Sequence, residues 1–241
     1  MDKLHLDQHI SRRYNEELEQ VRTDLIAMGR LASDLLAGSL QALLEADSSL
    51  GRSQDAADDR IDAFERSIDE KCQGILARRQ PAATDLRLVI AVLKTITDFE
   101  RMGDEAQKMA RMAIRRAESP AAVDLPEADG LRELGAHVGR MVDDTLAALA
   151  TLDGERALRV CREDPRVDEE YKALVQACLP AMSEAPANAL DVVWAARALE
   201  RIGDHACNIC EHLIYVLGGE DVRHTPIEEA ARTIRGAEDR R

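Results

Sequence analysis

Two copies of one acidic motif stand 100 residues apart in this chain of 241 residues. Glu100 and Asp104 enclose the tripeptide Arg-Met-Gly, and Glu200 and Asp204 enclose Arg-Ile-Gly. In a helix, residues four apart share one face and lie about 6 Å apart along the axis. Two carboxylates at that spacing suit a hard cation, because such ions prefer oxygen ligands.

A second, weaker repeat places two aspartates four residues apart, with an apolar residue directly before the second one. Its members are Asp58 and Asp62 in the first half of the chain, and Asp164 and Asp168 in the second. Asp62 stands 19 residues before Pro81, and Glu100 stands 19 residues after it. A helical hairpin that folds back at Pro81 therefore brings Asp62 level with Glu100. The same symmetry about residue 184 relates Asp168 to Glu200.

Each half is thus predicted to gather four carboxylates on neighbouring antiparallel helices. The two sets are Asp58, Asp62, Glu100 and Asp104, and Asp164, Asp168, Glu200 and Asp204. Carboxylates so close together repel one another and raise their pKa values, and a cation such as Mg, Mn, Ca or Fe relieves this. Asn208, one turn beyond Asp204, adds a candidate carbonyl ligand. The first copy has Lys108 at that place, which could instead neutralise part of the charge.

A second interpretation of the same residues, in which they bind no metal, also stays open. The carboxylates would then form solvated acidic faces that pair with nearby arginines, namely Arg60, Arg101, Arg166 and Arg201. Gly103 and Gly203, each costing a helix about 1 kcal/mol relative to Ala, predict close packing against a neighbouring helix, or else room for a ligand. Cys207 and Cys210 are expected to be core thiols, and His205 is expected at the surface.

The composition narrows the classes of function. Acidic residues number 46 against 32 basic ones, which gives a formal net charge of −14. This balance argues against nucleic acid as a partner, because phosphate backbones attract clustered Lys and Arg.

The first twenty residues lack the apolar segment of a signal peptide, and no run of 18 apolar residues occurs. The five cysteines fit reduced thiols, so we expect a soluble cytoplasmic protein without direct membrane insertion.

Apolar periodicity and helix breakers predict an all-α fold of six long helices. The expected helices span residues 6–46, 52–79, 84–117, 131–152, 155–182 (with a kink at Pro165) and 187–217. Thr84 or Asp85 is expected to cap the third helix, and Gly218 and Gly219 are expected to end the last one. Together with the repeated motifs, this pattern indicates a duplication that gives two tandem three-helix bundles. The expected divisions are a first repeat over 1–118, a linker over 119–130, a second repeat over 131–219 and a loosely held charged tail over 220–241, beginning at Glu220.

Taken together, several strings of the sequence resemble the PhoU family, the accessory and regulatory proteins of bacterial high-affinity phosphate uptake. These strings are His9-Ile10-Ser11, Ala77-Arg78-Arg79-Gln80-Pro81, Thr84-Asp85-Leu86-Arg87, both Glu-Arg-x-Gly-Asp copies, Cys161-Arg162-Glu163-Asp164 and Asn208-Ile209-Cys210-Glu211. The resemblance implies two three-helix bundles, and, as in some members, multinuclear metal clusters on the paired acidic motifs. The ions it suggests are Mg, Mn, Fe or Zn.

The resemblance also implies a function by contact. It predicts a non-enzymatic negative regulator of the phosphate-starvation response and a modulator of uptake. Its partners would be the ATPase subunit of the phosphate ABC transporter and a membrane sensor histidine kinase, with the protein itself a homodimer that reaches the membrane only through these partners. The alternatives are a metal-dependent enzyme acting on phosphate compounds through the carboxylates, and a helical adaptor without ligand. No HExxH, GxxxxGK[ST] or GxSxG motif and no Glu-x-x-His pair is present in the sequence.

Overall fold

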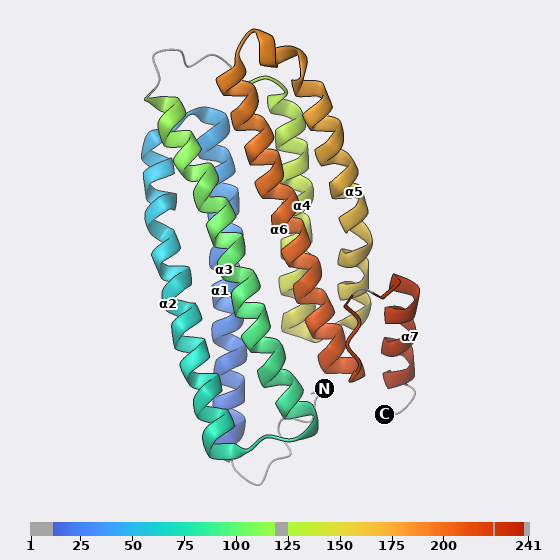
Figure 1. The fold of residues 1–241 in the computed structure, drawn as a ribbon. Coiled ribbons are helices and arrows are strands. Elements are labelled where there is room, and N and C mark those ends of the chain that lie inside the picture. The colour runs from blue at the N-terminus through green and yellow to red at the C-terminus, as the bar shows by residue number, and fades with distance from the viewer. Residues whose placement is uncertain (1–11, 119–124, 224, 239–241) are drawn as a thin grey trace.

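The computed structural model describes residues 12–118, 125–223 and 225–238. Within them the chain forms seven α-helices, a short 3-10 turn at Pro180–Ser183 and no strand (Figure 1). The helices are α1 (Arg12–Glu45), α2 (Ser48–Arg79), α3 (Ala83–Ala117), α4 (Ala128–Thr151), α5 (Gly154–Cys178), α6 (Pro186–Gly218) and α7 (Ile227–Glu238). The expected start of the first helix at residue 6 and the string His9-Ile10-Ser11 lie outside the described residues.

Local chemistry explains most of the helix ends. Asp47 caps α2 by accepting hydrogen bonds from the backbone N–H groups of Ser49 and Leu50. Asp153 caps α5 in the same way, accepting from the N–H of Arg156. At its carboxyl end, α6 stops at Gly219, whose φ of 84° suits glycine.

Four expected boundaries are wrong. Helix α2 begins at Ser48 rather than at residue 52, because Asp47 caps it. The residue that caps α3 is Ala82, which has no side-chain oxygen, so neither Thr84 nor Asp85 caps this helix. Helix α4 begins at Ala128, three residues before the expected position, and α5 ends at Cys178 rather than at residue 182. Pro165 lies inside α5. The division into domains stays a prediction.

The six long helices form two three-helix bundles side by side, as the fold prediction required (Figure 1). Helices α1, α2 and α3 enclose one part of the core, and α4, α5 and α6 enclose another. The bundles meet through two antiparallel pairs, α1 with α4 and α3 with α6. Ser33 on α1 donates a hydrogen bond to Asp143 on α4 at 3.1 Å, and Arg115 on α3 lies 3.7 Å from Asp191 on α6.

The charged tail contains a packed helix, which corrects the expectation that it is loosely held. Helix α7 lies against α5 and α6, and its residues Ala230, Ala231 and Ile234 are buried there. These positions, with Ile227, follow a helical period, so one apolar stripe is enough to attach an otherwise charged segment. Over the described stretches of chain, no helix is both long enough and apolar enough to cross a membrane.

Candidate functional site

The first pair of acidic motifs meets between α2 and α3. Asp58 on α2 is only 7% exposed, and burial raises its pKa to about 6, with further contributions from the charges of Asp62 and Asp104. Burial likewise raises the pKa of Glu100, followed by the charges of Asp104 and of Glu65. The hairpin about Pro81 therefore brings the four predicted carboxylates together, as the register between α2 and α3 required. It also brings in Glu65, which the pattern search missed although it lies three residues beyond Asp62 on the same helix.

Gly103 lets Asp58 approach the backbone of α3. A Cβ atom at Gly103 would lie 2.7 Å from Oδ1 of Asp58 and 2.8 Å from Cδ1 of Ile61. Both distances are far below an ordinary contact, so a side chain at this position would collide with α2. In this half of the chain, the motif glycine serves close packing.

The second pair of motifs meets between α5 and α6. Burial raises the pKa of Asp164 to about 6, and the charges of Asp204 and Asp168 add to the shift. Burial also raises the pKa of Asp204, followed by the charge of Asp168. Glu200 is buried, and its Oε2 atom has no hydrogen-bond partner. Burial and then the charge of Asp204 raise its pKa, which the Arg197 guanidinium partly counteracts.

The cations around the clusters are mostly different from the predicted ones. Arg201 pairs with Glu105, and Arg166 pairs with Glu163. Cluster carboxylates instead pair along their own helices in three ion pairs: Asp62 with Arg66 at 3.9 Å, Asp168 with Lys172 at 3.3 Å, and Glu200 with Arg197. Lys108 pairs with Glu105 at 3.0 Å, outside the cluster that it was expected to neutralise.

The donor chemistry of both clusters fits a hard cation. Every cluster donor is a carboxylate, several have raised pKa values, and the unpaired Oε2 of Glu200 is an oxygen that a cation would satisfy. In the conformation of the described residues, however, no three His, Cys, Asp or Glu side chains converge closely enough to hold an ion. Binding would require side-chain rotation, most directly the release of Glu200 from Arg197.

Asn208 belongs to a separate polar group between the bundles, centred on Asp98 of α3. Its Nδ2 atom donates to Oδ1 of Asp98 at 3.3 Å. Oδ1 also lies 2.9 Å from Nδ1 of His205, and Oδ2 lies 3.1 Å from Nε2 of His212. His205 is therefore buried, at 8% exposure, and the expectation that it lies at the surface is wrong.

The Asp98 group was missed because its partners are distant in sequence. Burial opposes ionisation of Asp98, but hydrogen bonds from His205 and His212 outweigh it and lower the pKa of this carboxyl. The spacing of seven residues between the two histidines, two helical turns, was the available signal. The expected core thiol is confirmed for Cys210, which is buried beside Thr145; Cys207 is half-buried.

A basic and aromatic surface covers the junction of α3 and α6. We call it the Trp194 surface; it consists of Lys108, Arg111 and Arg115 on α3, and Leu190, Trp194, Arg197 and Arg201 on α6. The single tryptophan of the chain is 62% exposed there, and Leu190, one turn away, is 45% exposed. A hollow of about 540 Å³ lies beside Trp194. This concentration of cations is unusual in a chain of net charge −14.

Comparisons with known proteins agree with the duplicated architecture. The family model for the PhoU domain matches twice, at residues 25–113 and 131–213. The chain is 44% identical to the phosphate-specific transport system accessory protein PhoU homolog of Pseudomonas aeruginosa, over 98% of this chain and 99% of the relative. It is 38% identical to the phosphate-specific transport system accessory protein PhoU of Escherichia coli, over 98% of each chain.

Two solved structures share the fold. The crystal structure of PhoU from Pseudomonas aeruginosa superposes with a TM-score of 0.81 and 44% identity, covering 86% of this chain and all of the other. The phosphate transport system regulatory protein PhoU from Streptococcus pneumoniae gives a TM-score of 0.78 at 26% identity, covering 86% of this chain and 98% of the other. With both acidic motifs in place and both halves matched by the family model, the chain belongs to the PhoU domain family.

Proposed function

We propose that this protein is an accessory protein of phosphate transport that represses the phosphate-starvation response when phosphate is plentiful. It acts in the cytoplasm through contacts with the ATPase subunit of the phosphate ABC transporter and with a sensor histidine kinase. The names of the relatives support the association with phosphate transport. The repression and the two partners follow from the family resemblance.

The observation that best supports regulation through partner binding is the Trp194 surface. Trp and Arg are the residues that most often dominate the energy of protein interfaces. Here an exposed tryptophan lies among five cations, and the exposed Leu190 lies one helical turn from it on α6. The ion pairs of Arg111 with Asp55 and of Arg115 with Asp191 are partly exposed and therefore weak, so a partner's carboxylates can replace them. Lys108, Arg197 and Arg201 instead pair with the buried carboxylates of Glu105 and Glu200. The surface therefore fits an acidic partner segment with apolar side chains.

Complementation of a deletion strain tests this mechanism. Deletion should leave the starvation response on in high phosphate, and the wild-type chain should silence it. A double variant, Trp194→Glu with Arg115→Glu, should fold but fail to silence. Leu179→Glu is the matched control, because Leu179 is also exposed but lies at the end of α5, and it should silence normally. Normal silencing by the double variant would contradict the proposed surface.

We propose further that the two carboxylate clusters bind divalent or iron-type cations (Mg, Mn, Fe or Zn) in a structural or tuning role. Replacing both Glu200 and Asp204 by Ala should abolish metal retention in the second half, with little change in helical content because Ala favours helices. Metal analysis of purified protein and circular dichroism measure the two effects. The control is Glu228→Ala with Glu229→Ala on the exposed side of α7. Unchanged metal content in the cluster variant would favour a salt-bridged face.

A metal-dependent enzyme acting on phosphate compounds is the second candidate. The feature that favours it is a pair of aspartates, the buried Asp58 and the half-buried Asp164, whose pKa values of about 6 suit proton transfer near neutral pH. Release of inorganic phosphate from phosphate esters by the metal-loaded protein, lost in Asp58→Asn and Asp164→Asn, would support this candidate over the non-enzymatic regulator.

We also propose a homodimer, the commonest assembly of soluble proteins. Light scattering at micromolar concentration should give about twice the chain mass of 26.6 kDa. A species of 26.6 kDa alone would exclude the dimer under those conditions.

A further inference from the structure

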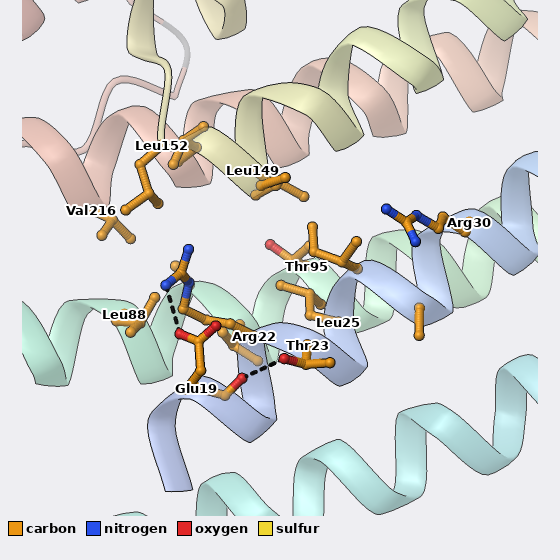
Figure 2. Close-up of a pocket in the computed structure, with 16 residues that line it drawn as sticks. Glu19, Arg22, Thr23, Leu25, Arg30, Leu88, Thr95, Leu149, Leu152 and Val216 are labelled. Atoms are coloured by element: carbon orange, nitrogen blue, oxygen red, sulfur yellow. Dashed lines mark hydrogen bonds and ion pairs between the residues drawn. The ribbon is translucent and has the colours of Figure 1, made fainter. Parts of the chain in front are cut away.

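A cavity of about 350 Å³ lies between the two bundles, apart from the carboxylate clusters and the Trp194 surface (Figure 2). Its walls come from α1, α3, α4 and α6, so both bundles build it. The walls are mainly apolar, with Leu25, Leu88, Val92, Leu149, Leu213 and Val216 among the lining residues. Small-molecule sites in proteins have this size and are lined mainly by apolar side chains with a few polar groups.

The charged groups of the cavity all come from α1. Figure 2 shows the side chains of Arg22 and Arg30 directed toward the space between α1 and the second bundle, with Glu19 beside Arg22. Nη1 of Arg22 lies 2.9 Å from Oε2 of Glu19, so these two charges balance each other. Arg30 makes no ion pair or hydrogen bond with any residue that the structure describes. Because Arg30 is exposed to solvent, it places at the edge of the cavity one positive charge that no described side chain pairs.

We propose that this cavity binds a fatty-acid-like molecule, with a single carboxylate at Arg30 and a hydrocarbon body against the apolar walls. An arginine fork matches a planar carboxylate with two parallel hydrogen bonds. The hydrocarbon body is favoured because each buried CH₂ group contributes about 0.8 kcal/mol.

The charges select against other ligands. A cationic head would face the positive charge of Arg30 and would be repelled. A neutral alcohol would fill the walls but would leave the arginine without a charged partner. Since the walls belong to both bundles, a bound molecule links them. It would stabilise their packing by mass action.

Titration calorimetry on the purified, delipidated full-length protein tests the proposal with decanoate below its micellar concentration. Decanoate should bind at one site per chain. Decanol and decyltrimethylammonium should bind at least about tenfold more weakly, because a hydrogen bond to a charged group is worth about 1.5–3 kcal/mol.

Variants locate the site. Arg30→Ala should weaken decanoate binding about tenfold. Arg52→Ala is the matched control, because Arg52 pairs with Glu118 far from the cavity lining, and it should leave the affinity unchanged. Ala27→Leu places extra volume at a half-buried lining position and should reduce binding without touching a charge.

Three results would each overturn the proposal: no binding of decanoate, equal binding of decanol, or equal affinity in the wild type and in Arg30→Ala. The assay uses purified protein alone. Its outcome therefore does not depend on the complementation experiment that tests the Trp194 surface. The proposed ligand of the cavity and the proposed contact mechanism can each fail without the other.

Discussion

At the scale of single residues, the two motif glycines show how one sequence pattern serves two different environments. A Cβ atom at Gly103 would lie 2.7 Å from Asp58, but at Gly203 the nearest atom would be Cγ1 of Val167 at 3.4 Å, an ordinary contact. Alanine at 103 therefore forces the buried side chains of Asp58 and Ile61 to shift, whereas position 203 has room for alanine.

Alanine substitutions should separate the two glycines. Gly103→Ala should lower the free energy of unfolding by about 1–3 kcal/mol, the usual cost of overpacking. Gly203→Ala should be neutral or raise it by up to about 1 kcal/mol, because alanine is the better helix former. Urea denaturation of the two variants measures both changes. Equal losses in the two variants would show that the glycine at 203 has a role other than packing.

The buried Asp58 should make the stability of the metal-free protein depend on pH. Its pKa is about 6 in the folded chain against 3.8 ordinarily, so the folded state holds the proton more tightly. The resulting penalty is absent below pH 3.8, grows as the pH rises, and is complete above about pH 6, where it costs about 2–3 kcal/mol. Stability therefore falls as the pH rises through this window.

Replacement of this carboxyl by a neutral amide isolates its contribution. In the presence of EDTA, Asp58→Asn should raise the free energy of unfolding at pH 7.5, and the gain should shrink by about half at pH 5. Denaturation at the two pH values measures the difference. A gain that does not change with pH would assign the effect to something other than ionisation of Asp58.

At the scale of helices, the sequence predicted the elements where chemistry is local. Pro81 and Gly219 mark the ends of α2 and α6, as expected, because each acts on its own turn. The cap at Asp47 was not predicted, so the start of α2 was placed too late. The start of α3 was misplaced because Ala82 carries no capping oxygen, so the fold and not a cap sets this end. Helix α7 was missed because only a few apolar residues attach it, and their effect depends on the surfaces of α5 and α6.

The contact between α3 and α6 should depend on Asp98. Asp98→Ala would leave the buried His205 and His212 without their carboxylate partner, which should cost about 2–4 kcal/mol of unfolding free energy. Asp98→Asn retains one acceptor oxygen and should cost less. Thr97→Ala, at the adjacent exposed position, is the control and should change stability little. If Asp98→Ala matched this control in urea denaturation, the group would not hold the two helices together.

At the scale of the whole molecule, the duplication was visible in the sequence but the packing between the halves was not. The register around Pro81 could be counted along the chain, and it brought Asp58 to Asp104 as predicted. Contacts between the bundles join residues far apart in the chain, such as Asp98 and His205, which are 107 positions apart, and no local pattern specifies them. The cavity at Arg30 arises from the same arrangement, so it also lay beyond sequence reasoning.

Whether α7 is an integral part of the second bundle can be tested with one side chain. Ile234 is buried against the first turn of α5. A Cβ atom added at Gly154 would lie only 2.7 Å from Cδ1 of Ile234, so the two helices pack closely there. Ile234→Ala should lower the free energy of unfolding by about 2 kcal/mol, at the lower end for a buried isoleucine because α7 is peripheral. In a chain of this size, the melting temperature should fall by about 4–8 °C.

The control is Arg232→Ala, which changes an exposed residue of the same helix and should leave the melting temperature unchanged. If α7 instead detaches before the bundle unfolds, Ile234→Ala would speed hydrogen exchange in residues 227–238 but leave the main transition in place. That result would contradict a shared unfolding unit. If the melting temperature falls in Ile234→Ala but not in Arg232→Ala, α7 belongs to the same cooperative unit as α5 and α6. A cavity under α7 destabilises the whole bundle only in that case.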